Sequence, residues 1–330
     1  MDENIKSQIE KIRRDCEVIK PLVVIRCITY NHKDYIKDAL DGFVNQKTSF
    51  PYVAIVHDDA STDGTVEIIQ EYALKYPEII KPIFEKENQY SKRDGSLSRI
   101  IRSATECLNA VYFADCEGDD YWIDPDKLQK QVDFLDANPD YSMCYTKVKR
   151  FEVATKSFKD EWGGDHQLLS EFLKMNTVPT LTSMLRVQTV VNYHSEIHPD
   201  KQKWMMGDYP LWLYIAATSK IKFLPMITGV YRILNESASH STDQKKVIEF
   251  NYSFFTIATF FAKRYNSPQF PIIEETKHWF EFKLRVYEFR VGFRETIGFI
   301  KKVKKRKYKF YAAICYLLPH KILRKYLTKS

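Results

Sequence analysis

Apolar positions along the first 150 residues follow two alternating patterns. Short β-branched and apolar runs, such as Pro21 to Thr29, are typical of strands buried on both faces of a parallel sheet. Segments such as Thr65 to Lys75 instead carry apolar residues three or four positions apart, which predicts helices with one buried face. The predicted strands are 21–29, 52–57, 79–84, 111–116 and 142–148, and the predicted helices are 1–20, 33–46, 65–75, 97–108 and 126–137. This alternation predicts a doubly wound α/β fold with ligands at the carboxyl ends of the strands.

The pattern changes in the last quarter of the chain. Residues 250–262 and 279–293 are rich in aromatic residues at helical spacing, which predicts helices that pack on one another and on the core. We therefore predict an N-terminal helix over 1–20, an α/β domain over 21–240, and a C-terminal helical region with a basic amphipathic tail over 241–330.

Charge is distributed unevenly along the chain. The net charge is +7, but residues 301–330 alone carry +11, so the remaining 300 residues sum to −4. Aromatic and aliphatic residues alternate with lysine and arginine in this tail, which favours a helix lying on an anionic membrane surface. An ordinary solvated helix face is the alternative, and the acidic body argues against nucleic acid as a partner. The nine uncharged residues from Phe310 to Leu318 are too few to cross a bilayer, which needs about 20.

The cysteines and the N-terminus bear on the compartment. None of the six cysteines forms a C-x-x-C pair or a zinc spacing, and Met1 is followed by acids without a nearby apolar stretch. We expect a reduced, cytoplasmic protein, peripheral at the inner face of the plasma membrane.

Acidic residues follow two of the predicted strands directly. Asp58 and Asp59 come after one strand, and Glu117, Asp119 and Asp120 come after another. Both clusters should lie at the same edge of a parallel sheet, and burying so many carboxylates is costly unless a cation or hydrogen-bond donors compensate them. The pattern therefore predicts a divalent metal with a bound phosphate. The alternative is a solvated turn or a helix cap.

Four ordered motifs give the chain a family resemblance between residues 21 and 239. They are Ile28-Thr29-Tyr30-Asn31, the loop from His57 to Thr65, the run from Glu117 to Trp122 with Pro125 and Leu128, and the segment from Gly207 to Leu211. Together they resemble family 2 glycosyltransferases. The resemblance implies the GT-A fold, a Rossmann-like mixed sheet flanked by helices, in which a nucleotide-binding half merges with an acceptor-binding half.

The resemblance also implies roles for residues that would bind the donor. Thr29 and Tyr30, with Asn31 beside them, match the strand end that holds the nucleotide base. Asp59 matches the acid that accepts a hydrogen bond from a uracil-type imide, and Arg102 lies roughly where the family places an arginine near the donor.

Further residues match the family's metal and diphosphate site. Glu117 and Asp119 occupy the two acidic places of its D-x-D motif, with glutamate in place of the first aspartate. The expected ion is Mg²⁺ or Mn²⁺, held by Asp119 or Asp120, and the sequence leaves open which is the direct ligand. Arg232 is expected to contact the diphosphate, and His240 is either a metal ligand or a solvated loop residue.

Three other residues need separate interpretations. Asp208 matches the catalytic base that deprotonates the acceptor hydroxyl, although an aspartate before a helix is commonly an N-cap. His32 and His57 lie next to the base loop and at a strand end, and we expect both to be structural.

The combined prediction is a metal-dependent, inverting transfer of a sugar from a nucleotide-diphosphate donor, a UDP-sugar, to a glycan or lipid-linked acceptor in surface polysaccharide synthesis. A sugar-phosphate nucleotidyltransferase is the rival enzyme, but Tyr30-Asn31-His32 stands where it would need a glycine-rich phosphate loop. A non-catalytic glycan-binding protein on the same fold should have lost the acids or Asp208, and all of them are present.

Overall fold

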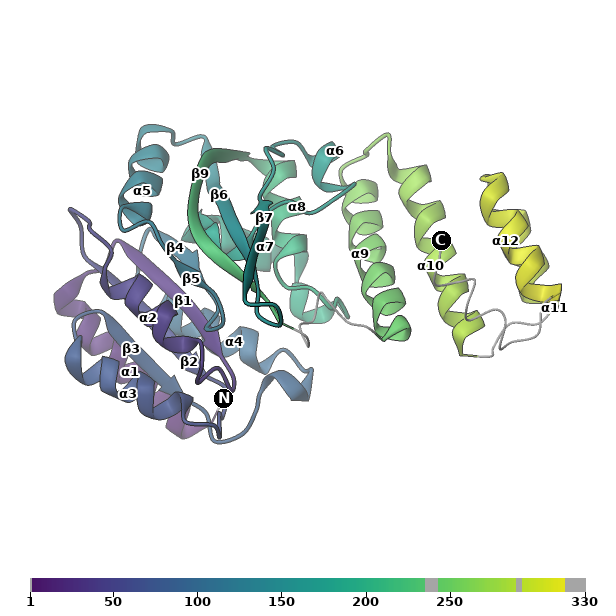
Figure 1. Cartoon of the computed structure of the whole chain (residues 1–330). Helices are drawn as coiled ribbons and strands as arrows, with labels where there is room; N and C mark the ends of the chain where they lie inside the picture. The colour runs from purple at the N-terminus through teal and green to yellow at the C-terminus, as the bar shows by residue number, and fades with distance from the viewer. Residues whose placement is uncertain (1, 235–242, 289–292, 318–330) are drawn as a thin grey trace. The chain divides into compact units, whose positions relative to one another are not determined.

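The computed structural model describes residues 2–234, 243–288 and 293–317 (Figure 1). It divides into two compact units that are not consecutive in sequence. The first unit comprises residues 1–168, 176–202 and 218–233, and the second comprises 169–175, 203–217 and 234–330. The predicted N-terminal helix thus belongs to the first unit, whereas the segment around Asp208 belongs to the second.

The first unit is built on one nine-stranded sheet. Its parallel half has the order β3-β2-β1-β4, formed by β1 (Val23–Thr29), β2 (Tyr52–Asp58), β3 (Ile80–Phe84) and β4 (Tyr112–Asp115). β1 and β2 are buried nearly throughout, as expected for strands covered on both faces. Val23 pairs with Tyr52 on one side and with Tyr112 on the other, so the carboxyl ends of β1, β2 and β4 meet at one edge.

The other half of the sheet is mixed. Its strands are β5 (Tyr121–Trp122), β6 (Tyr141–Glu152), β7 (Ser157–Trp162), β8 (Met184–Arg186) and β9 (Lys220–Ile233). β8 runs antiparallel to both β4 and β6, and β9 runs parallel to β6. β5 pairs antiparallel with β9, and β7 pairs antiparallel with β6. The prediction of a mixed GT-A sheet is confirmed, but the predicted strands do not include β5, β7, β8 or β9.

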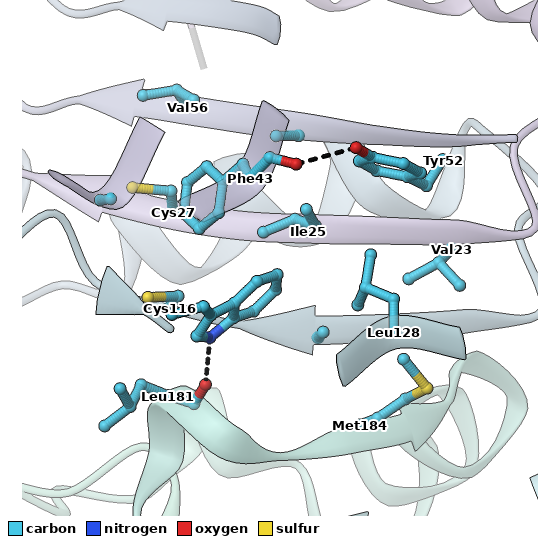
Figure 2. Close-up of a cluster of buried hydrophobic side chains, with 14 of the residues drawn as sticks. Val23, Ile25, Cys27, Phe43, Tyr52, Val56, Cys116, Leu128, Leu181 and Met184 are labelled. Carbon is cyan, nitrogen blue, oxygen red and sulfur yellow. Dashed lines mark hydrogen bonds between the residues drawn. The ribbon is translucent and has the colours of Figure 1, made fainter. Parts of the chain in front are cut away.

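Helices cover the parallel strands on both faces. The helices of this unit are α1 (Glu3–Ile19), α2 (Ile36–Val44), α3 (Thr65–Lys75), α4 (Ser96–Glu106), α5 (Lys127–Ala137) and α7 (Val187–Ile197), with short turns η1 (Tyr90–Lys92), η2 (Thr180–Thr182) and η3 (Pro199–Lys201). Apolar residues of α2, α3 and α5 share a core with β1, while α1 and α4 contact each other and the parallel strands. Figure 2 shows two hydrogen bonds that join this core, from the Tyr52 hydroxyl to the Phe43 carbonyl at 2.8 Å and from the Trp122 indole to the Leu181 carbonyl at 2.6 Å.

The second unit is helical. It contains α6 (Leu169–Phe172), α8 (Tyr209–Thr218), α9 (Gln244–Arg264), α10 (Phe270–Tyr287), α11 (Phe293–Lys302) and α12 (Arg306–Leu317). Stacked aromatic rings join these helices: the Phe255 and Phe280 centroids are 5.3 Å apart, and those of Trp279 and Tyr308 are 5.0 Å apart. The helix predicted over 279–293 instead begins at Phe270 and ends at Tyr287. Among the described residues, no helix combines the length and the apolarity that a membrane span requires.

Candidate active site

The two acidic clusters meet at the end of β1. The Asp59 amide donates to the Thr29 carbonyl at 2.9 Å, and the Gly118 amide donates to the Ile28 carbonyl at 2.9 Å. Each cluster is therefore tied by the main chain to the same strand end, as expected from parallel strands. The prediction that both acidic clusters lie at the same edge of the sheet is confirmed.

Gly118 allows the acidic turn to approach β1 closely. A Cβ atom built on Gly118 would lie 2.6 Å from the Thr29 Oγ1 and 3.0 Å from the Ile36 Cδ1. No side chain fits at these distances without displacement. The glycine between Glu117 and Asp119 is therefore required by space, because any larger residue would push the acids away from the sheet edge.

Arg232 on β9 holds the acidic turn in place. Its amide donates to the Asp120 carboxylate and its Nη1 to the Asp119 carbonyl, both at 2.7 Å. Its Nη2 pairs with the Asp38 carboxylate on α2, and its guanidinium lies 4.4 Å from the Tyr121 ring centroid. The contacts show Arg232 as a brace for this turn, while its predicted contact with a diphosphate stays a prediction.

Asp119 and Asp120 differ in their surroundings. Asp120 is buried, and burial together with the neighbouring Asp119 charge raises its pKa well above the usual range. The Oδ1 atom of Asp119 is also buried but has no hydrogen-bond partner in the described part of the chain. A buried carboxylate oxygen without a donor is unusual, so Asp119 has the free oxygen that a cation would need, whereas Asp120 is engaged with the backbone of Arg232.

The residues at this edge fit a divalent ion that is only partly coordinated by protein. Within residues 2–234, 243–288 and 293–317, no three His, Cys, Asp or Glu side chains come close enough to hold a metal by themselves. Oxygen ligands from a diphosphate would then complete the shell, as Mg²⁺ commonly requires. Glu117 is exposed, and the proposed ligand His240 lies outside the described residues.

Asp59 is held by the loop after β3. Its two carboxylate oxygens accept the backbone amides of Gln89 at 2.6 Å and Tyr90 at 3.0 Å, and the side chain is almost fully buried. Each oxygen has a second lone pair that can accept a further hydrogen bond. The predicted contact with a nucleotide base stays a prediction. The loop over 85–90 therefore shapes this part of the site.

The three residues predicted to hold the base lie in different environments. Thr29 is buried, and its Oγ1 lacks a partner in the described structure, while the Tyr30 ring is 46% exposed. Asn31 adopts a left-handed backbone conformation with φ of 54°. Its amide donates to Ser61 Oγ and its Oδ1 accepts from the Thr62 amide, both at 2.8 Å. Tyr30 therefore presents a ring for stacking, and Asn31 joins the loops after β1 and β2.

Histidine His32 lies in the same region. Its amide donates to Thr65 Oγ1 at 2.9 Å, and its buried Nδ1 has no hydrogen-bond partner among the described residues. Burial lowers the pKa of His32, and the negative charge of Asp119 is the largest influence in the opposite direction. The sequence did not indicate His32 or Asp38 as site residues. A polar residue in a loop or on a helix surface has no sequence pattern that distinguishes it from other surface residues.

Arg102 on α4 is engaged elsewhere. Its Nη1 donates to His194 Nδ1 at 2.7 Å and lies 3.4 Å from an Asp200 carboxylate oxygen. Burial and the charge of Arg102 lower the pKa of His194 to about 4. These contacts join α4 to α7 and the turn after it, and a donor-binding role for Arg102 stays a prediction.

Asp208 occupies the position before α8 in the second unit. Its carbonyl accepts the Trp212 amide at 3.1 Å, the first hydrogen bond of the helix, and its Oδ1 accepts the Tyr209 amide at 2.7 Å. Asp208 therefore lies at the N-cap position, although this side-chain hydrogen bond reaches the first helical amide, and a capping side chain usually reaches the second or third. The role as catalytic base stays a prediction.

A curled mixed sheet with acids at the carboxyl ends of its parallel strands defines a chain of the GT-A type. The sequence model described as glycosyl transferase family 2 matches residues 25–191, and the chain belongs to that family. The resemblance inferred from the four motifs is confirmed.

One individual relative is similar to this chain over a long segment. It is 34% identical over 232 residues to the "Uncharacterized protein Rv1520" of Mycobacterium tuberculosis, a match that covers 67% of this chain and 62% of that protein. The chain thus spans less than two thirds of the length of this curated relative.

Two solved structures show the same fold at low identity. S. aureus TarS 1–349 in complex with UDP-GlcNAc gives a TM-score of 0.55 at 16% identity and covers 85% of this chain and 79% of its own. The mannosyltransferase PcManGT from Pyrobaculum calidifontis, in complex with GDP-Man and Mn²⁺, gives 0.51 at 15% identity and covers 98% and 86%. These similarities support the architecture.

Proposed function

We propose that the protein is a metal-dependent, inverting glycosyltransferase that moves a sugar from a UDP-sugar to a glycan or lipid-linked acceptor in surface polysaccharide synthesis. The observation that carries this proposal is the unpartnered buried oxygen of Asp119 at the carboxyl edge of the sheet, in a turn held by Arg232. Membership of glycosyl transferase family 2 supports the reaction class. The UDP-GlcNAc complex of TarS supports the donor class, and Mn²⁺ with GDP-Man in PcManGT supports the metal.

The residues divide the work between donor and acceptor. A divalent ion would supply positive charge to the departing diphosphate, with Asp119 as its protein ligand and Arg232 keeping that aspartate in position. Tyr30 would stack on the base, whose imide would donate to Asp59. Asp208 would take the proton of the acceptor hydroxyl as that oxygen attacks the anomeric carbon.

The test is a thermal-shift panel of UDP-, dTDP- and GDP-sugars, each with and without Mn²⁺. A true donor should stabilise the protein by RT ln(1 + [L]/Kd), and only when the metal is present. Asp119→Ala should abolish this metal-dependent stabilisation, because it removes the free oxygen. The exposed Asp133→Ala serves as the matched control and should respond like the wild type.

The variant Asp120→Ala distinguishes a residue that binds the metal from one that only holds the acidic turn in place. It should lower the melting temperature itself, since it leaves the Arg232 amide without its acceptor. Stabilisation by nucleoside triphosphate plus sugar phosphate instead of by nucleotide sugars would indicate a nucleotidyltransferase. Stabilisation by glycans alone would indicate a glycan-binding protein.

We also propose that the second unit binds an anionic membrane surface from the cytoplasmic side. Lys301, Lys302 and the run from Lys304 to Lys307 are exposed around the start of α12, and the Phe310 ring is 64% exposed. Tyr308 stacks on Trp279, which fixes the first turn of α12 against α10. Exposed basic residues beside an exposed aromatic ring are typical of helices that lie at a lipid interface.

A further inference from the structure

Three buried polar atoms lack hydrogen-bond partners near the end of β1. They are the Oγ1 of Thr29, the Nδ1 of His32 and the Oδ1 of Asp119, and none of them has a partner in the described part of the chain. Buried polar side-chain atoms nearly always have a protein or water partner. Three unpaired atoms in one part of a site therefore indicate a group that binds there.

Close packing places the turn that carries Asp119 against Thr29, and His32 lies in the loop that follows Thr29. Thr29 is the last residue of β1, and Gly118 approaches it so closely that a Cβ atom would lie 2.6 Å from its Oγ1. Asp119 is the next residue after this contact. His32 follows Thr29 by three residues, and its amide donates to Thr65 Oγ1 at 2.9 Å. Burial lowers the pKa of its imidazole, and the negative charge of Asp119 acts in the opposite direction.

All three atoms can act as acceptors. A carboxylate oxygen has no proton, a hydroxyl oxygen has two lone pairs, and an imidazole protonated on Nε2 has a lone pair on Nδ1. None of the three has a hydrogen-bond partner among the described residues, and a cation or an ordered water can satisfy atoms of this kind. Oxygen ligands suit both Mg²⁺ and Mn²⁺, and one imidazole nitrogen among them favours the transition-metal ion, Mn²⁺.

We propose that His32, through Nδ1, is a second protein ligand of the divalent ion beside Asp119, with the Thr29 hydroxyl next to it, and that the diphosphate provides the remaining ligands. This inference rests on the proposed function, since it requires a metal-bound donor. It revises the expectation that His32 is structural, and it adds a protein nitrogen to the site that does not depend on His240.

The test is electron spin echo spectroscopy of the full-length protein with Mn²⁺ and UDP. A directly coordinated imidazole modulates the echo of Mn²⁺ through its nitrogen, and labelling histidine with ¹⁵N identifies that signal. The wild type should show the modulation, and His32→Leu should lose it. Mn²⁺ affinity in the presence of UDP, measured from the free-ion signal, should fall at least roughly tenfold in this variant.

Two further variants make the result specific. His32→Asn places a carbonyl oxygen near the position of Nδ1, so it should recover part of the Mn²⁺ affinity without the nitrogen signal. His198→Asn is the control, because His198 is exposed and its φ of 51° suits asparagine. It should behave like the wild type.

The outcomes distinguish the two proposals. If the wild type binds Mn²⁺ and UDP while His32→Leu keeps both the nitrogen signal and the affinity, another histidine such as His240 is the ligand and the inference is wrong. If the wild type shows no nitrogen signal, the unpaired atoms face water and the inference is equally wrong. If the wild type binds neither Mn²⁺ nor UDP, the proposed function itself fails.

Discussion

Replacing Gly118 by alanine should destabilise the first unit and also disturb the proposed metal site. The new Cβ would lie 2.7 Å from the Thr29 Cβ, whereas relaxed carbon–carbon contacts lie at about 3.5–4.0 Å. Thr29 is β-branched and buried, so its side chain cannot rotate away. The acidic turn must therefore move outward by about 1 Å, and overpacking of this kind costs about 1–3 kcal/mol.

Thermal unfolding and isothermal titration with UDP and Mn²⁺ measure the two effects. For a unit of this size, the destabilisation should lower the Tm by about 2–12 °C. UDP affinity in the presence of Mn²⁺ should also fall, because Asp119 moves with the turn. The matched control is Gly298→Ala on α11, where an added Cβ meets nothing within 4 Å, and its Tm should stay equal or rise.

The results separate parts of the reasoning. An unchanged Tm for Gly118→Ala would refute the close approach of the turn to β1. A lowered Tm with unchanged UDP affinity would show that Thr29 moves instead of Asp119. Gly118 would then have no role in positioning the proposed metal ligand.

Two other predictions concern the second unit. Asp208→Asn should lower the turnover number by on the order of 10² to 10⁴ with unchanged UDP affinity and Tm. The reason is that asparagine caps a helix about as well as aspartate but cannot take a proton. Sugar transfer near the wild-type rate would assign Asp208 to capping alone. Glutamine at three exposed basic positions should weaken co-sedimentation with phosphatidylserine vesicles by about 3 kcal/mol, roughly 150-fold. These positions are Lys302, Lys304 and Arg306. A control variant carries glutamine at three exposed lysines elsewhere, Lys11, Lys156 and Lys174. Equal losses in the two variants would show that binding follows net charge and not this surface.

Local patterns in the sequence determined the parallel half of the sheet. The strands from Val23 to Asp115 are short apolar runs, and the helices between them have clear amphipathic spacing, so neighbouring residues carry most of the information. Once four parallel strands are predicted, their carboxyl ends must share one edge. The location of both acidic clusters follows from this topology alone.

The mixed half of the sheet was decided by tertiary structure. β9 has 14 residues with an irregular sequence of buried and exposed positions, because it pairs with both β6 and the two-residue β5. Such a strand has neither the continuous apolar run nor the alternation by which strands are identified from sequence.

The detailed chemistry of the site depended on the same long-range contacts. The amide of Arg232 binds a carboxylate 112 residues earlier in the chain, and this contact distinguishes the engaged Asp120 from Asp119, whose oxygen is free. The sequence by itself determined that acids gather at the end of β4, because their position follows from a local strand. Which acid is free to bind a cation depends on the partners that the folded chain brings from distant segments, and no local pattern records them.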